Sequence, residues 1–360
     1  MNNTIIHTTV NQQIEKLKNQ NLIINNEAFA REMLSLYGYS NIIKSYREPY
    51  ILTTSTGIKY RSNIAFEQLF SLFILDKNLR SAVMAAMLDF EEHIKEIAAN
   101  VVCDSFGIHQ DDYLNYRNFQ NKRKHKSRFS LKNVLKTMNK ALDTDRNPIY
   151  HYKTIYSTVP PWILFKNIYF STIVNYIDQF KTKERTEAAK ILYSGSREVL
   201  NISDDSLGKL MLDTMFICLE YRNTVAHGGR TYNHVCQSTL RSDEIFGVGK
   251  VNLGTGFNQL LSLLSIVSYS SPFNQIEFAL NNLVNEHCNS YPQDATYLGQ
   301  VLNIDIVMRN IVHTLPSSER YHANPNCSGM MGSSSIELHE AESKGLSACK
   351  RCAQNIIPIV

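Results

Sequence analysis

The sequence lacks the long apolar runs and the leader-like blocks that mark membrane and secreted proteins. No apolar run reaches the roughly 18 residues that a membrane span requires. The first residues, MNNTIIHTTVNQQIEKLKNQN, are polar and contain neither the charged block nor the apolar block of a secretory signal. We therefore expect a cytoplasmic protein that does not act at a membrane.

A strong net charge and internal repeats are also missing. Lys and Arg number 37 against 33 Asp and Glu, so any surface that binds nucleic acid must come from local clustering of basic residues. No segment repeats at a fixed period, which excludes a solenoid. Hydrophobic residues make up 43% of the 360 positions, enough for one large domain with an ample core and smaller attachments.

Apolar residues recur at helical spacing through most of the chain, which predicts a mainly α fold. Residues 66–107 carry this spacing without proline and end at Gly107, so they form one long helix or a tightly joined pair. Residues 47–62 are β-rich around a glycine and predict a hairpin or a loop. Two or three short helices are expected within 8–46, with Asn25 or Asn26 as an N-cap and Gly38 as a stop. A helix capped by Ser203 or Asp204 is expected over 203–227. Further helices are expected over 159–180, 254–271 and 273–287.

The stretch LEYRNTVAHGGRTYN, residues 219–233, places Arg222 and His227 just before Gly228 and Gly229. Five steps of about 100° separate the arginine and the histidine by roughly 140°, so they cannot share one face of a regular helix. They must lie where the helix ends, because consecutive glycines free the backbone to leave it. A guanidinium and an imidazole there can meet a phosphate and a hydroxyl, which RNA offers side by side. The alternative is a helix C-terminus whose basic residues offset its dipole.

The segment RNTVAHGGRTYN resembles the signature of HEPN-domain ribonucleases in the form typical of the Abi abortive-infection family, where RN..AH..R..N recurs. Three further stretches resemble that family in the same order along the chain. They are the N-terminal helices (17–46), the FEQLFSLFILDKNLRSAVMAAMLDFE helix (66–91) and the PPWILFKNIYFSTIVNYI helix (160–177). The resemblance covers roughly residues 8–245, with gaps in a basic insertion, and it implies a HEPN-type helical bundle.

The resemblance also implies roles for particular residues. Arg222 and His227 match the catalytic pair, Asn223 matches the polar motif residue, and Glu91 matches an acidic residue that typically pairs with the motif arginine. The flanking positions are Arg230 and Asn233. The sequence departs from the family at Lys95, where arginine is frequent, and at residues 73–75, where the family often has an aromatic residue and a second phenylalanine.

A metal-independent endoribonuclease toxin of a phage-defence or toxin–antitoxin system is the function that the resemblance implies. His227 would be the general base or acid, Arg222 would stabilise charge on the phosphorane, and Asn223 would position the phosphate. Such domains usually form homodimers, and in some Abi-like systems a small noncoding RNA controls the protein. A non-catalytic RNA-binding HEPN scaffold, whose motif only shapes a pocket, is the alternative.

A basic segment lies in an irregular insertion at about 108–158. Five cations fall within seven positions and are flanked by Tyr113, Tyr116, Phe119 and Phe129; they are Lys122, Arg123, Lys124, Lys126 and Arg128. Cations supply affinity for phosphates and aromatic rings stack on unpaired bases, so this segment predicts an RNA-binding surface with strong salt dependence. The alternative is a solvated charged loop.

Cysteines cluster only near the C-terminus. Cys103, Cys218, Cys236 and Cys288 are scattered and predict small buried apolar residues. In contrast, His322 and Cys327 form one close pair and Cys349 and Cys352 another, the arrangement of a structural zinc site.

The same tail resembles a motif on thermonuclease-like proteins, here YHANPNC, EAESKG and ACKRC. The first spacing is one residue longer than in that motif, and alanine replaces a proline. His339 is a spare candidate ligand, and reduced cysteines without metal are the alternative. A filled tetrahedral site has no open position for catalysis, so the tail would serve recognition or stability.

These observations predict three regions. They are an N-terminal helical region (1–60), a HEPN helical core (61–295) that contains the basic insertion, and a zinc-binding-like tail (315–355).

Overall fold

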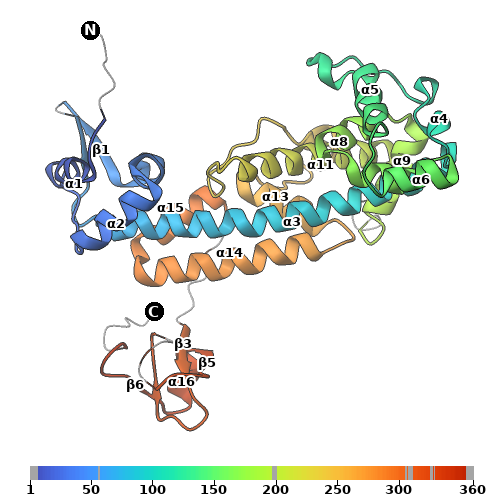
Figure 1. Ribbon diagram of the computed structural model, residues 1–360. Coiled ribbons are helices and arrows are strands. Elements are labelled where there is room, and N and C mark those ends of the chain that lie inside the picture. The colour runs from blue at the N-terminus through green and yellow to red at the C-terminus, as the bar shows by residue number, and fades with distance from the viewer. Residues whose placement is uncertain are drawn as a thin grey trace. The chain divides into compact units, whose positions relative to one another are not determined.

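The computed structural model describes residues 7–55, 57–196, 201–304, 306, 311–324, 327 and 329–353. It is mainly α-helical, which confirms the predicted fold class (Figure 1). The chain divides into two compact units. Unit 1 comprises Met1–Leu75, Leu280–Gln300 and Ile304–Val360, and unit 2 comprises Asp76–Ala279 and Val301–Asn303. Helices α3 (Phe66–Phe106) and α14 (Ser271–Ser290) contribute residues to both units.

Unit 1 begins with short helices and a hairpin. These are α1 (Val10–Asn19), α2 (Glu27–Tyr37), the π-helical turn η1 (Ser40–Lys44), the 3-10 turn η2 (Glu48–Tyr50) and the strands β1 (Ile51–Thr54) and β2 (Gly57–Tyr60). Asn26 is the N-cap of α2, because its side chain accepts a hydrogen bond from the amide of Phe29 at 3.0 Å. Gly38 follows α2 with φ +83°, as the sequence predicts. The strands pair antiparallel, with Ile51 opposite Tyr60, so the predicted hairpin is confirmed.

A buried carboxylate ties the remaining helices of unit 1 together. The turn η6 (Pro292–Asp294) precedes α15 (Ala295–Leu302). The side chain of Asp294 accepts hydrogen bonds from Tyr50 (2.6 Å), Gln68 (2.9 Å) and, when its Nε2 is protonated, His287 (2.8 Å). The His287 ring in turn contacts the hydroxyl of Ser71 at 2.8 Å. Because each oxygen of this buried carboxylate has a donor, the network stabilises the packing of η6 against α3 and α14.

The C-terminal part of unit 1 has a small core of its own. Strand β3 (Ile311–Thr314) pairs antiparallel with β5 (Ser334–Glu337), β4 (Arg320–Tyr321) pairs parallel with β6 (Ser347–Ala348), and α16 (Leu338–Ser343) lies between β5 and β6 in the chain. Its buried residues are Val312, Tyr321, Leu338, Ala341, Cys349 and Ala353. Because so few side chains are buried, hydrophobic stabilisation is limited, and a covalent or metal staple would contribute much of the stability.

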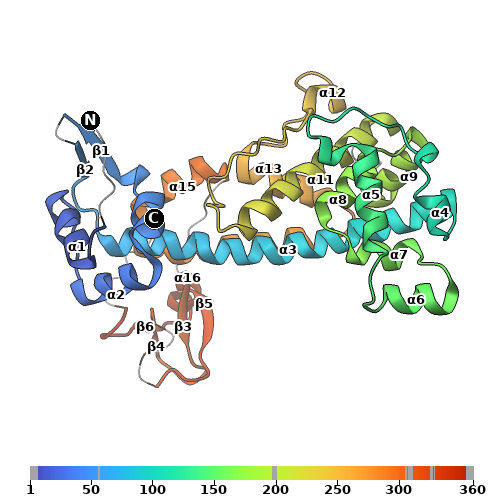
Figure 2. The ribbon, with the colours of Figure 1, turned by 45° about the horizontal axis from the view of Figure 1, so that its top comes forward.

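Unit 2 is built around α11. After α3 come α4 (Gln110–Tyr113), η3 (Tyr116–Asn118), η4 (Ser127–Phe129), α5 (Leu131–Ala141), α6 (Ile149–Tyr156), α7 (Pro161–Leu164), η5 (Phe165–Asn167), α8 (Phe170–Asp178), α9 (Thr182–Leu192), α11 (Asp204–Ala226), α12 (Ser242–Phe246) and α13 (Gly256–Ser265). Helices α8, α9 and α13 pack against α11 (Figure 2). Ser203 caps α11 by accepting a hydrogen bond from the amide of Ser206 at 3.2 Å.

Residues 66–106 form one helix, the first of the two alternatives that the sequence allows.

Two segments of unit 2 differ from the sequence-based expectation. The single helix expected over 159–180 is broken, because Ile168 and Tyr169 adopt extended backbone that buries Ile168 and exposes Tyr169. The insertion, which the sequence predicts to be irregular, contains the amphipathic helix α5, which packs against α8. The buried residues of α5 follow helical spacing, but the lysines between them made this pattern hard to recognise in the sequence. The buried residues are Leu131, Val134, Leu135 and Met138.

Among the described residues, no helix combines the length and the apolar character needed to cross a bilayer.

Candidate functional site

The motif ends α11 as the two glycines predict. His227 is the C-cap; the amide of Gly228 donates to the carbonyl of Val225 (3.1 Å), and the amide of Gly229 donates to that of Thr224 (2.9 Å). This pair of bonds is a Schellman motif, and Gly228 takes the left-handed conformation that it requires, with φ +70°. A β-carbon at Gly229 would lie 3.0 Å from the carbonyl oxygen of Thr224, so both positions favour glycine.

Two side chains of α3 fix the turn that follows the motif. Asp76 is fully buried, and its Oδ1 accepts hydrogen bonds from the amides of Thr231 and Tyr232, each at 2.9 Å. One turn later, Arg80 donates from Nη1 to the carbonyl of Gly228 at 2.7 Å. Sequence reasoning missed both residues. The available signal was a carboxylate within an apolar helix and a cation four residues after it, on the same face.

A cavity of about 810 Å³ opens beside the motif, within unit 2. One wall is the face of α11 that carries Phe216, Glu220, Asn223 and His227, which recur every three or four residues. The other walls come from α8, from the loop after α11, and from the insertion, which contributes Lys126, Arg128 and Phe129 along with residues of α5. The structure therefore brings two members of the motif and part of the basic segment to one cavity.

The predicted catalytic arginine does not line this cavity. His227 is exposed and Asn223 is half-buried, whereas the Nε of Arg222 lies 3.7 Å from Oε2 of Glu91 on α3. The other oxygen of that carboxylate contacts Nζ of Lys95 at 2.7 Å. Arg222 and His227 thus diverge, in line with the 140° expected from the helical repeat. A separation of 3.7 Å is too long for a hydrogen bond, so Nε of Arg222 and Oε2 of Glu91 interact through charge alone. Both atoms are buried and have no hydrogen-bond partner among the described residues.

The loop after the motif is held by acidic residues. Besides Asp76 at its start, Glu220 accepts hydrogen bonds from the amides of Gln237 (2.7 Å) and Ser238 (2.9 Å), and Asp213 binds both the backbone and the guanidinium of Arg241. The loop residues Arg230 and Asn233, expected to flank the catalytic pair, are half-buried and do not line the cavity. Three carboxylates from two helices therefore determine the path of this loop.

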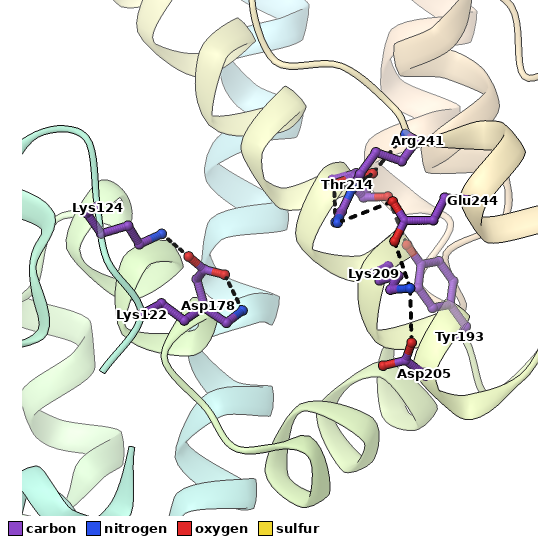
Figure 3. Close-up of polar contacts among 10 residues, drawn as sticks. Lys122, Lys124, Asp178, Tyr193, Asp205, Lys209, Thr214, Arg241 and Glu244 are labelled. Carbon is purple, nitrogen blue, oxygen red and sulfur yellow. Dashed lines mark hydrogen bonds and ion pairs between the residues drawn. The ribbon is translucent and has the colours of Figure 1, made fainter. Parts of the chain in front are cut away.

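The five cations of the insertion fall into two groups. Lys122 and Lys124 both form ion pairs with the buried side chain of Asp178 at the end of α8 (Figure 3). Burial lowers the pKa of each of these two lysines to about 8. They anchor the segment to α8, whereas Arg123, Lys126 and Arg128 are exposed.

Aromatic rings accompany these cations at the cavity. The guanidinium of Arg128 lies 4.6 Å from the centre of the Phe129 ring, and Nζ of Lys124 lies 5.5 Å from that of Phe216. Phe129 and Phe216 both line the cavity. Its wall therefore offers flat apolar surfaces next to positive charge, the combination that suits an unpaired nucleotide.

The four predicted ligands of the tail lie together. The donor atoms of His322, Cys327, Cys349 and Cys352 are all within 4.8 Å of one another, so the cluster can hold a metal ion. The amide of Arg351 donates to Sγ of Cys349 and lowers the pKa of that thiol, whereas burial raises the pKa of the Cys327 thiol. The spare candidate His339 is exposed, and its Nδ1 instead lies 3.1 Å from Oε2 of Glu337.

Replacing Asp76 with alanine tests the clamp on the motif. The Asp76→Ala change leaves the amides of Thr231 and Tyr232 buried without their acceptor, so we expect a loss of about 3 kcal/mol in the free energy of unfolding. Hydrogen exchange at these two amides should accelerate at least about tenfold. The matched control is Asp89→Ala, because Asp89 on the same helix accepts from Tyr269, Ser271 and Gln275. Equal exchange at 231–232 in both variants would show that Asp76 does not fix the turn.

One protein-family model matches the part of the chain that contains most of this site. Residues 32–233 match a family model described as Abi-like protein, which is more than half of the chain and includes α3, α8, α11 and the motif. No curated protein and no solved structure gives a match. The chain therefore belongs to the Abi-like protein family, which points to a role in abortive infection, a form of phage defence.

Proposed function

We propose that this protein is an endoribonuclease toxin of a phage-defence or toxin–antitoxin system, which cleaves RNA by transesterification without a catalytic metal. One observation carries the proposal: His227 and Asn223 share a cavity with two exposed cations of the insertion. An imidazole, an amide and positive charge around one cavity are the groups needed to bind a phosphodiester and move a proton beside it.

The proposed reaction begins at the ribose. His227 accepts the proton of the 2′-hydroxyl, whose oxygen then attacks the neighbouring phosphorus. The bond from phosphorus to the 5′-oxygen breaks, which leaves a 2′,3′-cyclic phosphate on one fragment and, after protonation, a 5′-hydroxyl on the other. Asn223 would hold a phosphate oxygen through its amide, one helical turn before His227 on the same face of α11. Arg222 would stabilise the charge that builds up on the phosphorane.

The divergence of Arg222 and His227 supports a homodimer as the active form. Arg222 extends from α11 towards Glu91 and is absent from the cavity that His227 lines. If two chains pair at this helix terminus, the arginine of one chain can reach the phosphate held by its partner. Nε of Arg222 makes no hydrogen bond to Glu91, so a turn of the guanidinium towards substrate would break no hydrogen bond there.

The exposed cations are the proposed contact for RNA. Lys126 and Arg128 would bind phosphates, and the rings of Phe129 and Phe216 would stack on bases. Arg123 and Arg230 would add positive charge outside the cavity. We also propose that a partner controls the activity of the protein. This partner would be a small noncoding RNA that binds the same basic surface.

The tail is proposed to hold one structural zinc ion. A set of three thiols and one imidazole matches the ligands of closed tetrahedral zinc sites, and the core beneath it is small. Zinc would then stabilise the fold of the tail and take no part in the cleavage of RNA.

Replacing His227 tests the cleavage reaction. We expect His227→Ala to reduce the rate of RNA cleavage at least about 100-fold and to relieve growth arrest, because the proton acceptor is removed. Thermal unfolding should stay close to that of the wild type, since the side chain is exposed. His151→Ala, another exposed histidine, is the control. If wild-type protein binds RNA without cleaving it, the alternative of a non-catalytic RNA-binding scaffold holds instead.

The two groups of cations predict different effects on RNA binding. Lys126→Ala combined with Arg128→Ala should weaken binding of single-stranded RNA and reduce the salt dependence of log K by about 0.7 for each phosphate that the protein no longer neutralises. The control replaces Lys132 and Lys136, which are exposed on α5 and do not line the cavity. An equal drop in affinity in both double variants would mean that only the overall charge matters.

Metal analysis tests the tail. Cys352→Ser should lower the bound zinc by one equivalent per chain and lower the melting temperature, because one of four ligands is removed. His339→Ala should leave both values unchanged, since this histidine lies outside the cluster. A wild-type chain whose zinc content and melting temperature match those of Cys352→Ser would contradict the proposed site.

A further inference from the structure

A second group of metal-ligating side chains lies apart from the tail. It comprises Glu220 on α11 and two residues of the loop that follows, His234 and Cys236. One carboxylate oxygen, one ring nitrogen and the thiol sulfur lie within 4.8 Å of one another, and all three residues are half-buried. From the sequence, Cys236 is expected to be a small apolar residue, because no neighbouring cysteine forms a pair with it. The fold instead brings it to a histidine and a carboxylate.

The spacing within this group suits a shared ion better than a hydrogen bond. Nε2 of His234 lies 3.3 Å from Oε1 of Glu220 and 3.4 Å from the hydroxyl of Thr224. Both separations exceed the usual hydrogen-bond distance of about 2.9 Å for a nitrogen donor. Two ligands at about 2.0 Å from one tetrahedral zinc ion are about 3.3 Å apart, which is the separation seen here.

Neighbouring groups orient two of the three ligands. The amides of Gln237 and Ser238 donate to the two oxygens of Glu220, and each oxygen keeps a further lone pair. The ring of Tyr221 contacts the His234 ring edge to face, with centroids 5.1 Å apart. Such outer contacts are typical of metal sites, where they fix the direction of each ligand.

In the described part of the chain, no lysine or arginine competes for the carboxylate of Glu220. Among the described residues, none of these cations forms an ion pair with Glu220, and its Oε1 lies 3.3 Å from the imidazole of His234. A carboxylate, an imidazole and a thiol together prefer zinc-like transition metals over magnesium or calcium, which take oxygen ligands.

We propose that Glu220, His234 and Cys236 bind a divalent transition-metal ion of the zinc class. Glu220 and His234 line the cavity beside the motif and Cys236 does not, so the ion would lie at the wall of the cavity. The ion connects α11 to the loop and holds residues 231–238 against the helix. It lies one helical turn from Asn223, so its occupancy sets the shape of the cavity wall. Metal binding here requires neither the zinc of the tail nor the cleavage of RNA.

The test counts metal in the full-length protein. We expect Cys236→Ser to bind one equivalent less of added Co²⁺ or Zn²⁺ than the wild type, whatever the tail retains. Cys103→Ser removes another half-buried thiol, which belongs to no metal-ligating group among the described residues, and should leave the count unchanged. Cys236→His should restore the missing equivalent with weaker thiolate-to-cobalt absorption, because imidazole replaces sulfur as the ligand.

Hydrogen exchange locates the ion. Added Zn²⁺ should slow exchange at residues 231–238 at least about tenfold in the wild type and leave it unchanged in Cys236→Ser. Equal metal counts in these two proteins, or protection by Zn²⁺ that is confined to the tail, would overturn the proposal. Neither readout uses RNA, so failure of the metal site and failure of the proposed nuclease are distinguishable.

Discussion

The buried carboxylate of Asp76 is the contact on which the geometry of the motif depends. The two glycines favour the end of α11 locally, but the direction of the chain beyond them is set from α3. Buried backbone amides need acceptors, and Asp76 supplies one acceptor to two consecutive amides. Because Glu220 and Asp213 bind the rest of the loop, the part of the cavity wall that the loop forms is held in place by α11 and α3.

Local features of the sequence were enough to predict where α11 ends and that the four tail residues lie together. They were not enough to predict the cavity. The paired glycines, the cap at Ser203 and the two close pairs of ligands act over a few residues, so pattern and spacing determine them. Asp76 and Thr231 are 155 positions apart. Their contact follows from how α3 packs on the end of α11, which periodicity alone does not specify. Cys236 was not recognised as a candidate ligand because Glu220 lies on α11, and the spacing of residues in the loop does not show that the loop returns to that helix.

The composition of the basic segment does not reveal which of its cations are paired and which are exposed. Lys122 and Lys124 differ little in sequence context from Lys126, yet Asp178 pairs with the first two and leaves the third exposed at the cavity. A single acid at the end of α8 therefore divides the cluster into an anchor and a surface. The anchor neutralises some of the positive charge of the segment, and it fixes the remaining cations beside Asn223 and His227 rather than in a solvated loop.

The separation of Arg222 from His227 follows from the helix itself. Five residues advance an α-helix by about 140° beyond one full turn, so this spacing turns the two side chains to different faces whenever the helix continues between them. A break in α11 or a second copy of the chain would bring both groups to one phosphate. The helix is unbroken up to Ala226, and the partner of Arg222 within the chain is Glu91. The proposed pairing of two chains at this helix end would let both groups act on one substrate.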